Sequence, residues 1–439
     1  MRFASLPRRL AAWSVAAALA GALAACGGNS TEIRIIGGGT ELPGSGPEVS
    51  VDGPQGPNTT ELVVDTGPSS GFALGVANLP YVTVTVCEPG STTACVTVDH
   101  VFLDTGSIGL RILRSALAPL ALPKRLVGGR TTVECFPFVV GAVWGPVASA
   151  DVHIAGESAA AIPVQIIDDA DSPAFPPTSD CQAAAGGELL RSVTTLQANG
   201  VLGVGMLGYD CGLVCDRGDY AGGYVLYYTC DGSDCRPAAV PADEQLRNPV
   251  TAFETNNNGT LIVMPAVPDS GASVARGRLV FGIGTQTNNQ LSAQVTPMFV
   301  QTDPSRDDYL YLSAESGGTR YPYSYVDSGS NGLFFDNAAL STRCAGSGGG
   351  ASWYCPPATT PVQASVSDAY GTSVSLELSI ASADLLFSTS NTAFSNLGGA
   401  VGSANPGAFV FGMPLFFGRT VYTAIWGQAL AVDGPWYAF

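Results

Sequence analysis

Charged residues are scarce in this chain, and basic ones are the scarcest. Only 13% of the 439 positions are charged, against about 25% in an average soluble domain, which argues against coiled coils and helix bundles. The chain has one lysine, Lys124, and a net charge of -17, which disfavours nucleic acid and anionic lipid as partners. Its two histidines, His100 and His153, are too few for a histidine-rich metal site or for most histidine-based catalysis. Any hydrolytic chemistry must therefore use other groups.

Long apolar runs are also missing beyond the first 26 residues, so no membrane-spanning helix is predicted there. Residues 1–26 have the pattern of a secretory signal: three arginines near the start, an Ala-rich stretch and a Leu-Ala-Ala-Cys ending at Cys26. This ending resembles the lipobox of bacterial lipoproteins, in which the cysteine is lipidated. The resemblance implies a lipid anchor at Cys26 as the sole membrane contact and, since no Asp follows the cysteine, an outer-membrane location on its periplasmic or surface face. An ordinary signal peptide with a chance cysteine is the alternative.

The other ten cysteines form an even set, which in an oxidising compartment predicts up to five disulfides. Zinc binding is the alternative role for these cysteines. No pair of them has the CxxC spacing of a zinc knuckle, so no metal is expected. Connectivity is open, and short separations suggest four pairs and leave a fifth: Cys87 with Cys95, Cys211 with Cys215, Cys230 with Cys235, Cys344 with Cys355, and then Cys135 with Cys181.

Gly, Pro, Ser and Thr dominate residues 27–60, which predicts a flexible tether. Beyond it, the pattern is that of strands: residues 81–86 alternate apolar and polar side chains, and 95–98 resume the alternation after a turn. Only short segments, such as 242–253, look helical. The predicted fold class is therefore all-β with few short helices. Further short strands are predicted around 136–166, 199–207, 261–284, 309–335, 362–387 and 408–425.

One sequence pattern occurs once in each half of the chain. Val-Phe-Leu-Asp-Thr-Gly-Ser-Ile-Gly-Leu at 101–110 is matched by Ser-Tyr-Val-Asp-Ser-Gly-Ser-Asn-Gly-Leu at 324–333. In both, an apolar strand runs into an Asp, a hydroxyl residue, a Gly and a Ser. The repeat suggests two lobes, 61–240 and 241–439, with one motif in each.

An Asp placed directly after a buried strand is aimed by that strand, and the Gly that follows allows a tight turn. If the two loops meet, the carboxyl groups of Asp104 and Asp327 lie close together. Two such like charges cannot both ionise easily, so the pair retains one proton and provides a general base and a general acid. The ionised member would take a proton from a water that attacks a peptide carbonyl, while the other donates to the carbonyl oxygen. This chemistry needs no cofactor, no metal and no covalent intermediate.

At these motifs the sequence resembles the pepsin-like aspartic peptidases. Three further segments, 199–205, 277–282 and 409–423, are similar to segments of that family and occur in the same order. The resemblance covers about 80–430 and implies a bilobal double β-barrel that acts as an aspartic endopeptidase on polypeptide. We expect a monomer.

The resemblance also implies roles for the residues that support the two aspartates. Thr105 and Ser328 would cross-link the loops, and Ser107 and Ser330 would bind the outer carboxylate oxygens. The remaining supporting positions are the loop glycines, Gly106 and Gly329.

The chain departs from the family at the hairpin, or flap, that covers the substrate with a Tyr at its tip. The best ungapped match, 136–156, places Phe138 at that position, and Trp144 is another candidate for the flap and for substrate binding. Where the family often has an aromatic residue after the first motif, Arg111 and Ile112 follow Leu110. A non-catalytic lipoprotein that binds peptides or envelope components in the same cleft is therefore the alternative function. Two intact Asp motifs favour the enzyme.

Three further features of the sequence do not predict an additional functional site. Asp65-Thr66-Gly67 competes with the first motif, but Pro68 replaces the hydroxyl residue, so a strand end is predicted there. The GxGxxG match at 203–208 is followed by a cysteine loop in place of a helix, so no dinucleotide is expected. Arg34 is the one basic residue between 27 and 65, so no basic inhibitory pro-segment is expected.

Overall fold

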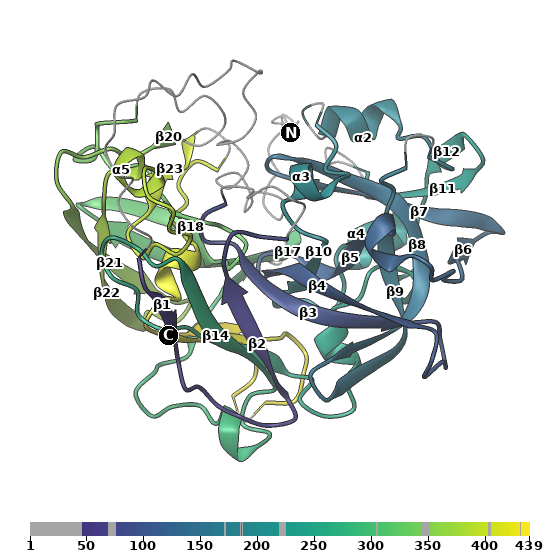
Figure 1. Ribbon diagram of the computed structural model, residues 1–439, viewed down its shortest axis with the longest axis horizontal. Helices are drawn as coiled ribbons and strands as arrows, with labels where there is room; N and C mark the ends of the chain where they lie inside the picture. Colours follow the sequence, from purple (N-terminus) through teal and green to yellow (C-terminus); the bar gives the residue numbers. More distant parts are fainter. Residues whose placement is uncertain are drawn as a thin grey trace, which may run out of the picture.

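The computed structural model describes residues 46–68, 76–170, 173–184, 186, 188–218, 225–303, 306–344, 352–402, 405–430 and 432–439. The predicted signal sequence, Cys26 and the first part of the predicted tether lie outside them. Strands dominate and the helices are short, so the predicted all-β class is confirmed (Figure 1).

The first half of the chain contains β1 (Glu48–Ser50), β2 (Thr59–Val64), β3 (Pro80–Cys87), β4 (Cys95–Asp104), β5 (Ile108–Leu113), α1 (Arg114–Leu117), β6 (Leu126–Val127), β7 (Arg130–Phe138), β8 (Gly141–Ile154), β9 (Glu157–Ile167), α2 (Ser179–Ala184), α3 (Val193–Leu196), β10 (Gly200–Val204), α4 (Gly212–Arg217), β11 (Tyr227–Asp231) and β12 (Asp234–Pro237). In Figure 1 most of this half, from β3 to β12, forms one side of the molecule, while β2 lies in the middle and β1 on the opposite side.

The second half forms the opposite side. Its elements are the 3-10 turns η2 (Ala242–Glu244) and η3 (Pro249–Ala252), β13 (Gly259–Val263), β14 (Val274–Phe281), η4 (Thr287–Asn289), β15 (Met298–Phe299), β16 (Gln301–Asp303), β17 (Arg306–Ser316), β18 (Thr319–Val326), β19 (Leu333–Phe334), β20 (Ser352–Trp353), β21 (Thr360–Ser367), β22 (Ser373–Ile380), α5 (Ala383–Phe387), β23 (Gly398–Ala400), β24 (Val410–Phe411), η6 (Met413–Leu415), β25 (Thr420–Ala424) and β26 (Trp436–Ala438).

The strands form where the sequence alternates. β3 and β4 make the predicted hairpin, with Val84 opposite Val98 and the Cys87–Cys95 pair next to the turn. β21 and β22 pair antiparallel along their full length, and alternate residues of β21 are buried. A strand with one face on the core and one in water produces this period of two.

Strands from the two halves of the chain pair with each other in one sheet. β14 pairs with β2 along one edge and with β1 and β13 along the other, and β2 also pairs with β3 (Figure 1). The predicted tether therefore extends too far: Glu48–Ser50 is a strand, and Asn58 is buried and donates from its amide to the Phe281 carbonyl at 2.7 Å. The Gly and Pro content of this segment masked the strand that pairs with β14.

A single large hydrophobic cluster runs through both halves, from Leu62 near the beginning to Tyr437 near the end.

Within the described residues, no helix has the length and apolar character needed to cross a membrane.

Five disulfides join the pairs that the sequence suggested. Cys135–Cys181 links β7 to α2, and the other four close short loops. Disulfides form and persist in oxidising compartments, so the protein belongs in an extracellular or periplasmic setting.

Candidate active site

The two Asp motifs lie at the ends of buried strands. β4 ends at Asp104, and Asp327 directly follows β18. Asp104 is 1% exposed and Asp327 is 0% exposed. The preceding residues, Leu103 and Val326, are fully buried and anchor the strands in the core, which fixes where each carboxyl group points.

Hydrogen bonds from its own loop hold the first carboxylate. The backbone N–H of Gly106 donates to Asp104 Oδ1 at 2.7 Å, and the Ser107 hydroxyl donates to Asp104 Oδ2 at 2.5 Å.

The second loop repeats this arrangement. The Gly329 N–H donates to Asp327 Oδ1, and the Ser330 hydroxyl donates to Asp327 Oδ2, both at 2.8 Å. Each loop therefore holds its carboxyl group with the same two donors, a glycine N–H and a serine hydroxyl.

Two hydroxyl residues join the loops to each other. The N–H of Ser328 donates to Thr105 Oγ1 at 2.9 Å, and the N–H of Thr105 donates to Ser328 Oγ at 3.1 Å. Ser328 Oγ also donates to the Leu103 carbonyl at 2.8 Å. These reciprocal bonds lock the loops face to face.

The glycines of each loop lie against the carboxyl group of the other. A Cβ built on Gly106 would lie 2.7 Å from Asp327 Oδ1, and one built on Gly329 would collide with Asp104 Oδ1. The inner oxygens of the two aspartates therefore face each other across the two glycines, where a side chain on either glycine would have no room.

Burial is the largest cause that raises the pKa of Asp327 well above its ordinary value, and the charge of Asp104 adds to it. The bonds from Ser330 and Gly329 oppose this shift. The pair consequently retains a proton on Asp327 over a wider pH range than an exposed aspartate would.

One strand passes behind each loop. β10 runs parallel to β4, with Gly203 opposite Asp104, and antiparallel to β5. β24 has the same relation to β18 and β19. Close packing requires glycine here, since a Cβ on Gly203 would lie 2.5 Å from the Ile108 nitrogen. These strands lie in the segments 199–205 and 409–423, whose sequences are similar to segments of the pepsin-like peptidases.

The two aromatic residues predicted for the flap are both buried. Phe138 packs edge-on against Phe136 in a hydrophobic cluster. Trp144 packs against Tyr228, and its indole N–H donates to the Phe175 carbonyl at 2.6 Å. Trp144 is thus a core residue, and neither side chain is placed to touch a substrate in this structure. The sequence could not distinguish an aromatic residue in the core from one at a cleft.

The hairpin of β7 and β8 is tied down near its turn. Ala142 exchanges backbone hydrogen bonds with Glu188 and Leu190, at 3.0 and 2.8 Å. The Cys135–Cys181 disulfide adds a covalent link from β7. Residues 188–190, for which the sequence predicts no role, therefore restrain this hairpin.

Asp65, the competing aspartate, takes part in a different contact. Its carboxylate lies 3.3 Å from His100 Nε2 and accepts the Gly67 N–H at 2.9 Å. Burial raises the pKa of Asp65, but the bonds from His100 and Gly67 outweigh burial and lower it. Asp65 directly follows β2, at the strand end that the sequence predicts, and its carboxylate pairs with His100.

The His100 pair predicts a small pH effect on stability. The hydrogen bond that His100 donates to the Asp65 carboxylate is the main cause that raises the pKa of His100. A raised pKa means that the pair stabilises the fold at acidic pH and that this contribution is lost as pH rises through the folded-state value. In urea denaturation, His100→Gln should lower the free energy of unfolding by up to about 1 kcal/mol at acidic pH and by less at alkaline pH. Equal losses at both would contradict this assignment.

The sequence gave no signal for Asn78, which ties the second loop to its surroundings. Its amide donates to the carbonyls of Asn331 and Phe394 at 2.8 and 2.9 Å, and its side-chain oxygen accepts the Phe394 N–H at 2.7 Å. Asn78 is fully buried with φ of 57°, a left-handed conformation that asparagine tolerates.

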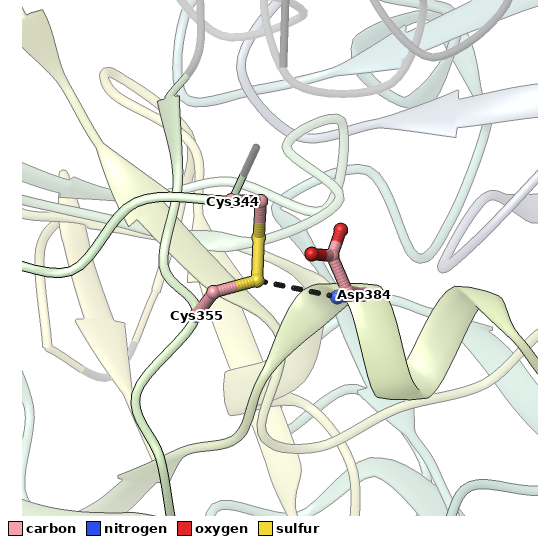
Figure 2. A group of neighbouring side chains, drawn as sticks. All are labelled: Cys344, Cys355 and Asp384. Atoms are coloured by element: carbon pink, nitrogen blue, oxygen red, sulfur yellow. Dashed lines mark hydrogen bonds between the residues drawn. A yellow bond between two sulfur atoms is a disulfide. The ribbon is translucent and has the colours of Figure 1, made fainter. Parts of the chain in front are cut away.

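Among the described residues, one group of potential metal ligands lies together: Cys344, Cys355 and Asp384. Figure 2 shows that the two sulfurs are joined in a disulfide and that the Asp384 N–H donates to Cys355 Sγ at the start of α5. Disulfide sulfurs do not provide the thiolates that zinc binds, so this group serves the fold.

Comparison with known proteins gives a family and a similarity to solved structures. No curated protein sequence matches the chain. Among solved structures, the chain is similar to an aspartic proteinase from Irpex lacteus, with 11% identity, a TM-score of 0.47, and coverage of 87% of this chain and 96% of that one. A family model described as "Protein of unknown function (DUF3443)" matches residues 54–439. The match spans nearly the whole described structure, and the chain therefore belongs to the DUF3443 family.

Proposed function

We propose that this protein is an aspartic endopeptidase whose catalytic residues are Asp104 and Asp327. The observation that carries the proposal is the pair of buried carboxyl groups, each held by the same two donors and facing the other across two glycines. Two coupled acids in the interior destabilise the fold, so their presence favours a catalytic role over a structural one.

In the proposed reaction, Asp327 carries the shared proton because burial and the charge of Asp104 raise its pKa. Asp104, ionised, takes a proton from a water bound between the two carboxyl groups, and the water oxygen bonds to the peptide carbonyl carbon. Asp327 donates its proton to the carbonyl oxygen, which gives a neutral diol. The C–N bond then breaks, the amine nitrogen receives the proton held by Asp104, and a diol proton returns to Asp327.

The proposed substrate is exposed or unfolded polypeptide, because the peptide bond must reach two carboxyl groups that are buried. The proposed setting is the bacterial cell envelope, with the monomeric protein anchored through a lipid on Cys26 at the outer membrane.

The test is a cleavage assay on a denatured polypeptide from about pH 3 to about pH 8. We expect the wild type to generate new peptide termini, and to incorporate one oxygen from labelled water at each new carboxylate. Asp104→Asn and Asp327→Asn should generate none. No cleavage by the wild type at any pH, or equal cleavage by all three proteins, would end the proposal.

A non-catalytic peptide-binding protein is the second candidate, and the restrained hairpin favours it. A hairpin tied to residues 188–190 and to α2 opens less readily to admit a substrate and release products. In that case, the wild type and both Asn variants would bind the denatured polypeptide and cleave none of it.

A further inference from the structure

Outside the two aspartates, fully buried charges gather around Arg111. The side chains of Arg111, Glu134 and Asp210 have no exposed surface. Charged side chains are almost never fully buried unless they are paired, and this chain has few charged residues. Arg111 lies on β5, the strand that leaves the first aspartate loop.

The guanidinium group binds on two sides. Its Nη2 and Nε donate to the two oxygens of Glu134 at 2.6 and 3.2 Å, and Nη2 also donates to Asp210 Oδ2 at 3.2 Å. Its Nη1 donates to the Ile108 carbonyl at 2.7 Å, and its face stacks on the Phe136 ring at 3.8 Å. Ile108 directly follows the serine that binds the Asp104 carboxylate, so Arg111 holds the end of that loop.

The cluster reaches the same loop by a second route. The Tyr227 hydroxyl lies 2.8 Å from Asp210 Oδ1 and accepts the Leu246 N–H at 2.8 Å. Leu246 packs against Gly109, where a built Cβ would lie 2.8 Å from the Leu246 Cβ and where φ is 94°. The segment from Ile108 to Gly109 is therefore held by a hydrogen bond on one side and by a leucine on the other.

The charges of the cluster balance only if it keeps a proton. One guanidinium faces two carboxylates, which would leave a net negative charge in the interior. Burial, and next to it the charge of Glu134, raises the pKa of Asp210 well above its ordinary value. With the proton shared between the two acids, the cluster is neutral and fully hydrogen-bonded, which makes it rigid.

Glu134 brings the hairpin into this cluster. It lies on β7, opposite Gly145 of β8, and its carbonyl accepts the Gln165 amide at 2.8 Å. The cluster thus connects the first aspartate loop to the hairpin whose sequence matches the family's flap.

We infer that Arg111 is a positioning residue, which fixes the first aspartate loop against the hairpin and so sets the orientation of the Asp104 carboxyl group. This inference rests on the proposed peptidase function. Movement of Ile108 would displace Ser107, whose hydroxyl binds Asp104 Oδ2, and the carboxyl group would turn with it. A misplacement on the order of 1 Å at a reacting group costs about 100-fold in rate.

Arg111→Lys is the test, because lysine keeps the charge and loses the fixed geometry of the four donated bonds. Arg125→Lys is the matched control: Arg125 lies in the same half, pairs with Glu244 at 2.6 Å and is partly exposed. The measurements are kcat and KM on a peptide substrate, and backbone amide exchange at residues 105–109. A merely structural role would change the melting temperature alone.

We expect Arg111→Lys to lower kcat by about 10-fold or more with KM within about 2-fold, and to speed amide exchange in the loop. Arg125→Lys should change neither. A folded Arg111→Lys protein with the wild-type kcat and wild-type exchange would overturn the inference. If the wild type cleaves nothing, the proposed function fails, and amide exchange alone decides whether Arg111 positions the loop.

If Arg111→Lys does not fold, the same measurements are made on a triple variant in which the cluster is neutral. Arg111→Met, Glu134→Gln and Asp210→Asn together remove all three charges at similar volume, and neutral replacements of buried ion pairs often preserve stability. The same fall in kcat and the same faster exchange are expected. Wild-type values for both would overturn the inference.

Discussion

Asp327→Asn is expected to abolish peptide hydrolysis and, at the same time, to stabilise the protein at neutral pH. The activity falls because asparagine can neither hold nor release the proton that the pair shares. Removing one member of a catalytic unit typically costs about 10⁴-fold or more in kcat. The protein therefore loses its function and becomes more stable through the same substitution.

The sign of the stability change follows from the raised pKa of Asp327, which burial and the charge of Asp104 cause. Because the folded state binds this proton more tightly than the unfolded state does, the fold loses stability as pH rises from the ordinary pKa to the raised one. Above that window the loss persists, and Asn removes it. The difference in unfolding free energy between variant and wild type should grow with pH across this range.

Urea denaturation at several pH values measures this difference. Asp336→Asn is the control, since Asp336 is exposed and lies in the same half. It should leave both activity and the pH dependence unchanged. An Asp327→Asn protein that is less stable than the wild type at neutral pH would show that the second carboxylate stabilises the fold in its ionised form.

Gly329→Ala is expected to inactivate the protein and to destabilise it by about 3 kcal/mol. The added methyl group would enter the space occupied by Asp104 Oδ1. The loops are locked by the Thr105 and Ser328 hydrogen bonds, so they cannot separate to make room. The carboxyl groups would be pushed apart, which removes the shared proton as well as the water position.

Gly208→Ala is the matched control for this substitution. A Cβ on Gly208 would meet nothing within 4 Å, and this glycine also follows a buried strand. We expect its activity and melting temperature to match the wild type. If Gly329→Ala retained normal activity, the loops would be less tightly packed than the distances around Gly106 and Gly329 indicate.

The sequence predicts those parts of the site that depend on local patterns. Asp104 and Asp327 each follow an apolar strand and precede a hydroxyl residue and a glycine, and the structure brings both carboxyl groups together. Four of the five disulfides could be suggested from short separations, since chain connectivity keeps such cysteines near each other, and these four left Cys135 for Cys181, 46 residues away. Each Asp motif and each short disulfide loop lies within about ten residues, so a local sequence pattern can reveal it.

The parts that sequence reasoning missed depend on contacts between distant segments. Arg111 was noted only as a departure from an aromatic residue, because its partners Glu134 and Asp210 come from other elements. Trp144 was assigned to the flap because aromatic character alone does not reveal burial. β1 was assigned to the tether, since its partner β14 lies in the other half of the chain.

The pairing of β2 with β14 also affects how the molecule acquires its fold. Asn58 and its partner Phe281 are separated by 223 residues, so the amino-terminal strands leave the ribosome long before the strand that completes their sheet. Their edges stay unpaired during that delay, and unpaired edges readily associate with other chains. Newly made molecules would therefore depend on holding factors until the carboxy-terminal half arrives, and a protein cut between the two halves would assemble only when both pieces are present together.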